Sequence, residues 1–175
     1  MNMKTKEITM IGLMAALTCI AGPLSLPLPF SPVPISLTNL AVYFAVYLLG
    51  MKRGTISYCV YLLLGLVGMP VFSAFTSGPA KILGPTGGYL IGFVFMAVIC
   101  GWFVDRWNGK PVPSFIGMVA GTAVCYAFGT AWLAFQAKMS FGAALAAGVL
   151  PFLLGDAVKI ILSIAVGMPV RVRVR

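Results

Sequence analysis

Residues Gly88–Val104 read GYLIGFVFMAVICGWFV, an apolar run without a single charged side chain. A run of about 20 apolar residues has the length that an α-helix needs to cross the hydrocarbon core of a bilayer. Similar runs recur along the chain, which is 61% hydrophobic and only 9% charged, far from the roughly 25% charged composition of soluble domains. The sequence therefore predicts an all-α integral membrane protein.

Six such runs are predicted to be transmembrane helices, because backbone polar groups in hydrocarbon must be bonded internally. Their predicted bounds are Ile8–Leu26, Leu37–Gly50, Gly54–Met69, Gly88–Val104, Ser114–Phe135 and Pro151–Val170. The first run leads into a proline-rich stretch instead of a small-residue cleavage site, so it is expected to be retained as a helix. No composition shift marks a domain boundary, and residues 1–175 are expected to form a single domain.

The basic residues predict that both ends of the chain lie in the cytoplasm, since positive residues near span ends stay on that side. In this orientation only Lys81 and Lys138 lie outside, and Lys159 falls within the last span. The cytoplasmic residues are Lys4, Lys6, Lys52, Arg53, Arg106, Lys110, Arg171, Arg173 and Arg175. Topology and contact with anionic membrane lipid thus account for the net charge of +9, and no nucleic-acid partner is expected.

Three connecting segments on the outer side have distinct compositions. Prolines between 23 and 34 remove amide donors and predict an extended or irregular segment, a candidate lid over the bundle. The Gly- and Pro-rich segment Pro70–Gly87 is expected to be non-helical and packed against protein or a cavity. The linker Gln136–Leu150 is expected to carry a short surface helix before Pro151.

Of the three acidic residues, only Asp156 lies inside an apolar helix. Glu7 and Asp105 lie at cytoplasmic span ends, where solvated or interfacial roles are expected. Lys159 follows Asp156 by three residues, so both side chains project from one helix face and can neutralise each other. This pair is interpreted either as an ion pair that locks helices together or as a polar site for a small solute, since it offers both acceptors and donors.

The sequence lacks several features that are typical of enzyme active sites and metal centres. It has no histidine, and its four cysteines lie singly in apolar stretches, so they are expected to be small buried hydrophobes. No Ser/His or Cys/His arrangement is present to activate a nucleophile, and no G-x-x-x-x-G-K-[ST] loop is present to bind ATP. The chain is expected to be neither an enzyme nor an ATPase and to use no cofactor or metal.

Three ordered segments resemble the BioY family, the biotin-specific S-components, or substrate-capture subunits, of energy-coupling-factor (ECF) vitamin transporters. They are SPVPISLTNLAVY (31–43), GPTGGYLIGF (84–93) and GVLPFLLGDAVK (148–159). The resemblance covers nearly the whole chain, and the three segments together are more specific than any one of them. It implies a six-helix protein of the bacterial plasma membrane that binds biotin in an outward-facing cavity closed by outer loops. The implied partners are a transmembrane coupling subunit and two ATPase subunits.

The resemblance also implies which residues bind the ligand. Asp156 matches the family's acid on the last helix and would accept from a ureido N–H, while Lys159 would donate to a ligand oxygen. Thr86, Gly87 and Tyr89 match a loop-to-helix motif whose backbone amides suit a ligand oxygen. Asn39 begins the second span, either as a ligand contact or as a helix-starting residue.

Two further features of the resemblance remain open at this point. Small residues at Gly12, Ala15, Ala16 and Cys19 give the first span a face for docking the coupling subunit, with internal packing as the alternative. Lys81 is either the partner of the ligand's valerate carboxylate or a solvated loop lysine. The competing functions are capture of another vitamin, a self-sufficient secondary carrier or channel, and a membrane enzyme.

Overall fold

The computed structural model describes residues 5–29 and 31–174, and most of them are helical. In chain order the elements are α1 (Thr5–Ala21), β1 (Ser25–Leu28), β2 (Ser31–Ser36), α2 (Thr38–Leu66), the 3-10 turn η1 (Ser73–Phe75), α3 (Pro79–Leu83), α4 (Gly87–Arg106), α5 (Pro111–Ala137), α6 (Phe141–Gly148) and α7 (Leu153–Val174). Lys4 and Arg175, which the charge argument places in the cytoplasm, lie outside the described residues.

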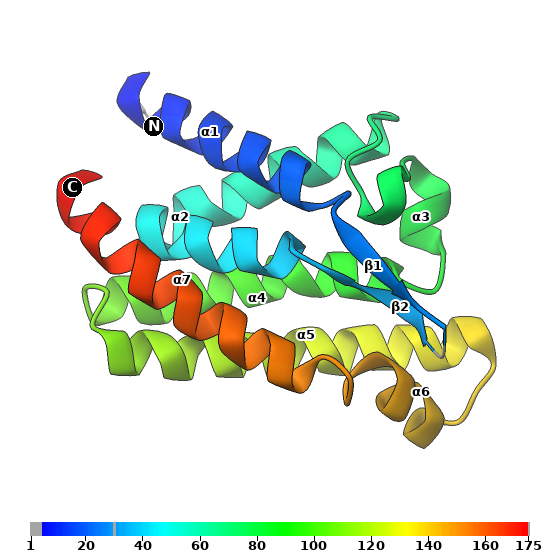
Figure 1. The fold of residues 1–175 in the computed structure, drawn as a ribbon. Coiled ribbons are helices and arrows are strands. Elements are labelled where there is room, and N and C mark those ends of the chain that lie inside the picture. The colour runs from blue at the N-terminus through cyan, green and yellow to red at the C-terminus, as the bar shows by residue number, and fades with distance from the viewer. Residues whose placement is uncertain (1–4, 30, 175) are drawn as a thin grey trace.

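The long helices form one bundle in which α4 and α5 share the most extensive contact. Helix α2 packs against α1, α4 and α7, so it lies at the centre of the arrangement. The N- and C-terminal ends marked in Figure 1 lie at one end of the bundle. The β1–β2 hairpin, α3 and α6 lie at the opposite end, where the outer segments are expected (Figure 1).

Glycines set two helix ends that differ from the sequence prediction. Helix α2 is broken at Gly50 (φ 81°, ψ −176°), which separates the two predicted spans, yet helix resumes at once instead of after a loop. Helix α1 stops at Ala21 and not at Leu26. A Cβ on the following Gly22 would come within 2.3 Å of the Val71 carbonyl oxygen, so this close approach and Pro23 end the helix there.

The outer segments are largely as predicted. The proline-rich stretch forms an antiparallel hairpin with Ser25 opposite Ser36 and Leu28 opposite Ser31. The linker before Pro151 contains α6, the short helix expected there. The segment Pro70–Gly87, expected to be non-helical, instead contains the turn η1 and the single helical turn α3.

By length and composition, three helices within the described residues are suited to crossing a membrane: α4, α5 and α7. Helix α1, with 17 residues, and the two halves of α2 on either side of Gly50 are shorter. The six spans and the cytoplasmic location of both chain ends therefore remain predictions.

Candidate functional site

A pocket opens at the end of the bundle that carries the hairpin. It holds about 700 Å³ of space free of protein atoms, including its open mouth. The hairpin supplies Val33, Pro34 and Ser36 to its wall. Helices α2, α4, α5 and α7 supply most of the rest, together with the 70–87 segment, the end of α6 and the connection between α6 and α7. The hairpin is tied down by two serine hydroxyls: Ser31 Oγ donates to the Ala147 carbonyl at 2.8 Å, and Ser25 Oγ accepts from the Ala74 amide at 2.9 Å.

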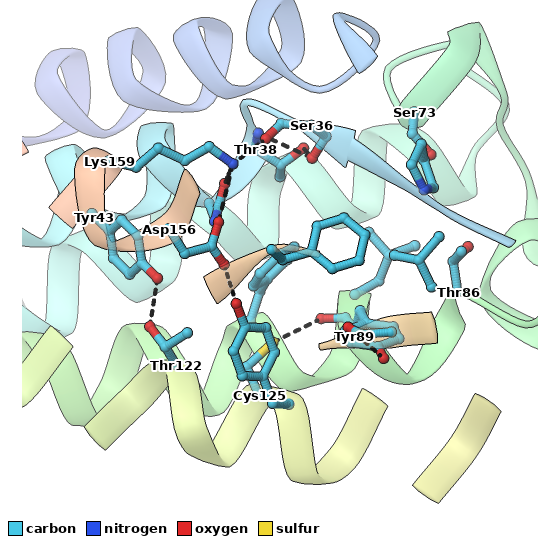
Figure 2. Close-up of a pocket in the computed structure, with 18 of the residues that line it drawn as sticks. Ser36, Thr38, Tyr43, Ser73, Thr86, Tyr89, Thr122, Cys125, Asp156 and Lys159 are labelled. Carbon is cyan, nitrogen blue, oxygen red and sulfur yellow. Dashed lines mark hydrogen bonds and ion pairs between the residues drawn. The ribbon is translucent and has the colours of Figure 1, made fainter. Parts of the chain in front are cut away.

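Asp156 lies at one end of this pocket and is 6% exposed. Its Oδ1 accepts from Asn39 Nδ2 at 2.7 Å and from Lys159 Nζ at 3.1 Å. Its Oδ2 accepts from the Tyr126 hydroxyl at 2.6 Å. The carboxylate is thus held by side chains of α2, α5 and α7, the elements whose packing forms this end of the pocket (Figure 2).

Lys159 uses its full donor capacity within the protein. Besides Asp156, its ammonium donates to the Ser36 carbonyl at 2.8 Å and to Asn39 Oδ1 at 3.0 Å (Figure 2). An ammonium group has three protons, so these three contacts account for all of them. The pair predicted from the sequence is therefore formed, and it is embedded in a larger network.

This network leaves one acceptor site and one donor next to each other. An ionised carboxylate offers about four lone-pair sites. Three contacts to Asp156 are described, which leaves a site on Oδ2. The Asn39 amide has a second N–H for which no partner is found among the described residues. Asn39 is a pocket residue and not a helix cap, because α2 starts at Thr38 with Leu37 in the cap position.

The loop-to-helix motif forms the opposite end of the pocket, where Figure 2 shows Ser73 and Thr86 far from Lys159. Gly87 is required there, since a Cβ would lie 1.6 Å from the Ile82 carbonyl oxygen. The Gly87 and Tyr89 amides already donate to the Gly84 and Thr86 carbonyls, so little of the expected amide cluster is left to meet a ligand. Tyr89 lines the pocket while its hydroxyl donates to the Gly148 carbonyl at 3.1 Å.

Lys81 also lines the pocket, from the short helix α3. Its side chain is partly buried, and this loss of hydration lowers the pKa of its ammonium below the usual 10.5. Lys81 therefore belongs to the site and is not the fully solvated loop lysine of the alternative interpretation.

Sequence reasoning missed Tyr126 and the pair formed by Tyr43 and Thr122, whose hydroxyls hydrogen-bond beside the pocket. These residues lie on helices far apart in the chain, so no spacing connects them with Asp156. The available signal is chemical: a tyrosine in an apolar helix needs a partner for its hydroxyl when it is buried.

The small residues of α1 do not share one environment. Gly12 and Ala16 are exposed, and a Cβ added to Gly12 would meet nothing within 4 Å. Ala15 is 2% exposed, and Cys19 packs against the core of this chain. Only the Gly12 and Ala16 side of the predicted docking face is open to a partner, and internal packing occupies the other side.

Known proteins resemble the chain over almost its whole length. The biotin transporter BioY2 of Lactococcus lactis is 35% identical over 167 residues, which cover 95% of this chain and 91% of that protein. The biotin transporter BioY of Thermotoga maritima is 32% identical over 163 residues, which cover 93% of this chain and 94% of that protein.

A crystal structure described as the S-component for biotin from an ECF-type ABC transporter has the same fold, with a TM-score of 0.90 at 33% sequence identity. The match covers 97% of this chain and 95% of that one. The BioY family itself matches residues 1–175, the full length of the sequence. The chain is a member of the BioY family.

Proposed function

We propose that this chain captures biotin at the outer face of the bacterial plasma membrane as the S-component of an ECF transporter. The observation that carries the proposal is the neighbouring free donor and acceptor of Asn39 and Asp156 in the pocket. Further support comes from the likeness, over 97% of the chain, to a structure described as an S-component for biotin.

The chemistry of the network suits a cyclic urea. A ureido ring presents N–H donors beside a carbonyl acceptor, so one N–H donates to the open site on Asp156 Oδ2. The carbonyl then accepts the second N–H of Asn39. Lys159 neutralises Asp156 and positions Asp156 and Asn39. The resemblance implies that Lys159 donates directly to the ligand. For that role its ammonium has to exchange one of its three bonds within the protein for a bond to the ligand.

The rest of the pocket wall suits the apolar part of the ligand. Phe93, Phe152 and Leu90 line it, with Val33 of the hairpin. Pockets for small molecules are typically apolar with a few placed polar groups, which matches this distribution. Thr86, Gly87 and Tyr89 shape the far end, and the hairpin forms the lid of the site.

The proposed topology has six crossings: α1, the two halves of α2, α4, α5 and α7. The two marked chain ends lie together, and the pocket lies at the other end of the bundle (Figure 1). With basic residues retained inside, the chain ends are cytoplasmic and the pocket faces outward. This orientation presents the ligand site to the solution from which biotin is taken up.

The energy for uptake comes from partners, because the sequence has no loop to bind ATP. The chain assembles with a transmembrane coupling subunit and two ATPase subunits, and Gly12 and Ala16 on α1 lie at the docking face. Membrane lipid surrounds the remaining apolar surface. The names of the relatives, all transporters, support a role in transport and not in catalysis.

Binding of labelled biotin to the purified chain in lipid nanodiscs tests the proposal. Saturable binding that excess biotin displaces, and that thiamine, riboflavin and niacin do not, is expected. Absence of saturable biotin binding would remove the proposal, and displacement by another vitamin would favour that vitamin as the ligand. Uptake into liposomes by the chain alone, lost when the proton gradient collapses, would favour a secondary carrier.

A further inference from the structure

A groove separate from the pocket lies between α5 and α7. It holds about 610 Å³ of space free of protein atoms, including its open side. Its wall consists of six apolar residues, Pro111, Val112 and Phe115 of α5 with Ile161, Ile164 and Ala165 of α7. None of the six lines the pocket that contains Asp156. This α5–α7 groove therefore belongs to a different part of the molecule from the proposed biotin site.

The groove lies where α7 leaves α5. Near the outer end of the bundle the two helices are joined, because the Tyr126 hydroxyl of α5 donates to Asp156 of α7 at 2.6 Å. Further along α7 the close contact is with α2, since a Cβ on Gly167 would lie 2.5 Å from the Tyr47 ring. Figure 1 shows α7 running obliquely to α5. The space opens between the beginning of α5 and the second half of α7.

The position of the groove along α5 corresponds to the depth of lipid acyl chains. Both α5 and α7 are suited to crossing a membrane, so a groove open at their surface meets lipid. Its first residue, Pro111, is also the first residue of α5. Phe115 lies four residues further, about 6 Å deeper at 1.5 Å per residue. The groove thus extends from the predicted cytoplasmic surface into the hydrocarbon region.

The rim of the groove carries positive charge. Lys110, which directly precedes Pro111, is exposed, and so is Arg106 in the last turn of α4. No ion pair with an acid is found for either residue in the described part of the chain. The Arg106 guanidinium lies 6.0 Å from the ring centre of Trp107, and tryptophan is typical of the headgroup level. An apolar groove below an uncompensated cation is complementary to a lipid with a negative headgroup.

We propose that an anionic phospholipid of the cytoplasmic leaflet occupies the α5–α7 groove. One acyl chain lies against the six apolar residues, and the phosphate binds the Lys110 ammonium. The proposal uses the predicted orientation of the chain but does not depend on which vitamin the outer pocket binds. Anionic lipids of the cytoplasmic leaflet attract basic residues near its surface. A zwitterionic lipid offers the same chains without net charge, so Lys110 makes the site selective for the headgroup.

Native mass spectrometry of the full chain tests this selectivity. The chain is purified with equal amounts of phosphatidylglycerol and phosphatidylcholine that have the same acyl chains, and the retained lipids are counted. We expect the unaltered chain to retain phosphatidylglycerol in about fivefold preference, the effect of one basic residue near an anionic surface. Lys110→Gln is expected to lose the preference. Lys138→Gln, the same change at an exposed lysine outside the groove, is expected to keep it.

A second pair of variants tests the location of the site. Ala165→Phe fills the groove and is expected to reduce retention of both lipids at least fivefold. Val166→Phe is the matched control, because Val166 is exposed on the same helix and does not line the groove. Equal losses in the two variants would contradict the assignment to the groove. The melting temperature of each variant shows that it is folded.

Three further outcomes would overturn the proposal. The first is equal retention of the two lipids by the unaltered chain. The second is a preference for phosphatidylglycerol that survives unchanged in Lys110→Gln. The third is a dimer of the unaltered chain that Ala165→Phe disrupts and Val166→Phe does not, which would assign the groove to a second copy of the chain. Lys110→Arg keeps the charge and is expected to retain the preference.

Discussion

Two polar clusters join the first half of α2 to α7, one at each end of the bundle. The outer cluster consists of Asn39, Tyr126, Asp156 and Lys159. The inner cluster consists of Tyr47, Asp105, Gly109 and Arg171. Both bring charge into a largely apolar protein, but only the residues of the outer cluster line the pocket.

The side chains of the inner cluster form hydrogen bonds with backbone groups at the break in α2. In an unbroken helix the Met51 amide would donate to the Tyr47 carbonyl, four residues earlier. At Gly50 the chain leaves the helical conformation, and the Met51 amide donates instead to Asp105 Oδ2 at 2.8 Å. The Tyr47 carbonyl accepts from Arg171. The Met51 amide and the Tyr47 carbonyl are thus each bonded to a side chain of suitable charge.

The two clusters differ in the groups to which their charged side chains bond. Arg171 and Asp105 bind backbone groups and do not line the pocket, so their charges serve to stabilise the fold. In the outer cluster, Asp156 and Asn39 line the pocket, bond mainly to other side chains and keep one acceptor site and one N–H without a partner among the described residues. Substitutions in the inner cluster are therefore expected to change stability, and those in the outer cluster to change affinity.

The largest effect is expected for Arg171→Met. The change removes a side chain that is 5% exposed and leaves the Tyr47 carbonyl without its charged donor, so we expect a loss of about 3 kcal/mol in the free energy of unfolding. Unfolding in detergent measures this loss, with exposed Arg173→Met as the control. The biotin dissociation constant of the folded protein should stay within about threefold. Normal stability with lost binding would contradict the division between the clusters.

A smaller effect, on affinity, is expected for Asp156→Asn. The substitution keeps the shape of the side chain but replaces one acceptor oxygen with a donor group, so biotin binding should weaken by about 1–3 kcal/mol. Isothermal titration with biotin measures the change, and the melting temperature is recorded in parallel. If Asp156→Asn melts earlier but binds biotin as before, the pair is an ion pair that locks helices, the alternative left open by the sequence.

The sequence was sufficient to predict contacts within one helix. Asp156 and Lys159 lie three residues apart on α7, and helical geometry alone places them on one face. Arg171 was assigned to the cytoplasmic side from its charge, but its burial against Tyr47 depends on how α7 packs on the broken helix α2. Such contacts join residues more than 100 positions apart, and no local periodicity encodes them.

The prediction of the fold had a similar limit. Proline correctly indicated an extended segment between α1 and α2, since it fixes the backbone and removes donors. The two extended pieces pair with each other as a hairpin, and its place over the pocket depends on contacts with Ala74 and Ala147, which lie in distant segments. Composition therefore indicated the local conformation but not its position.

The smallest of these effects is expected for Tyr126→Phe, which sharpens the account of the outer cluster. The change removes the hydroxyl that donates to Asp156 Oδ2 at 2.6 Å and leaves the other two bonds of the carboxylate in place. Because Asp156 Oδ2 is the oxygen proposed to meet the ligand, its position becomes less fixed. Biotin affinity should fall by about 1 kcal/mol, or roughly fivefold, in the same titration.

Tyr58→Phe is the matched control for Tyr126→Phe. Its hydroxyl donates to the Leu90 carbonyl at 2.9 Å, and the side chain is buried outside the pocket lining. Its loss should lower stability by about 1 kcal/mol and leave the biotin dissociation constant unchanged. Equal losses of affinity in the two variants would mean that tyrosine hydroxyls affect binding only through general packing. A loss confined to Tyr126→Phe would instead assign this hydroxyl to the positioning of Asp156.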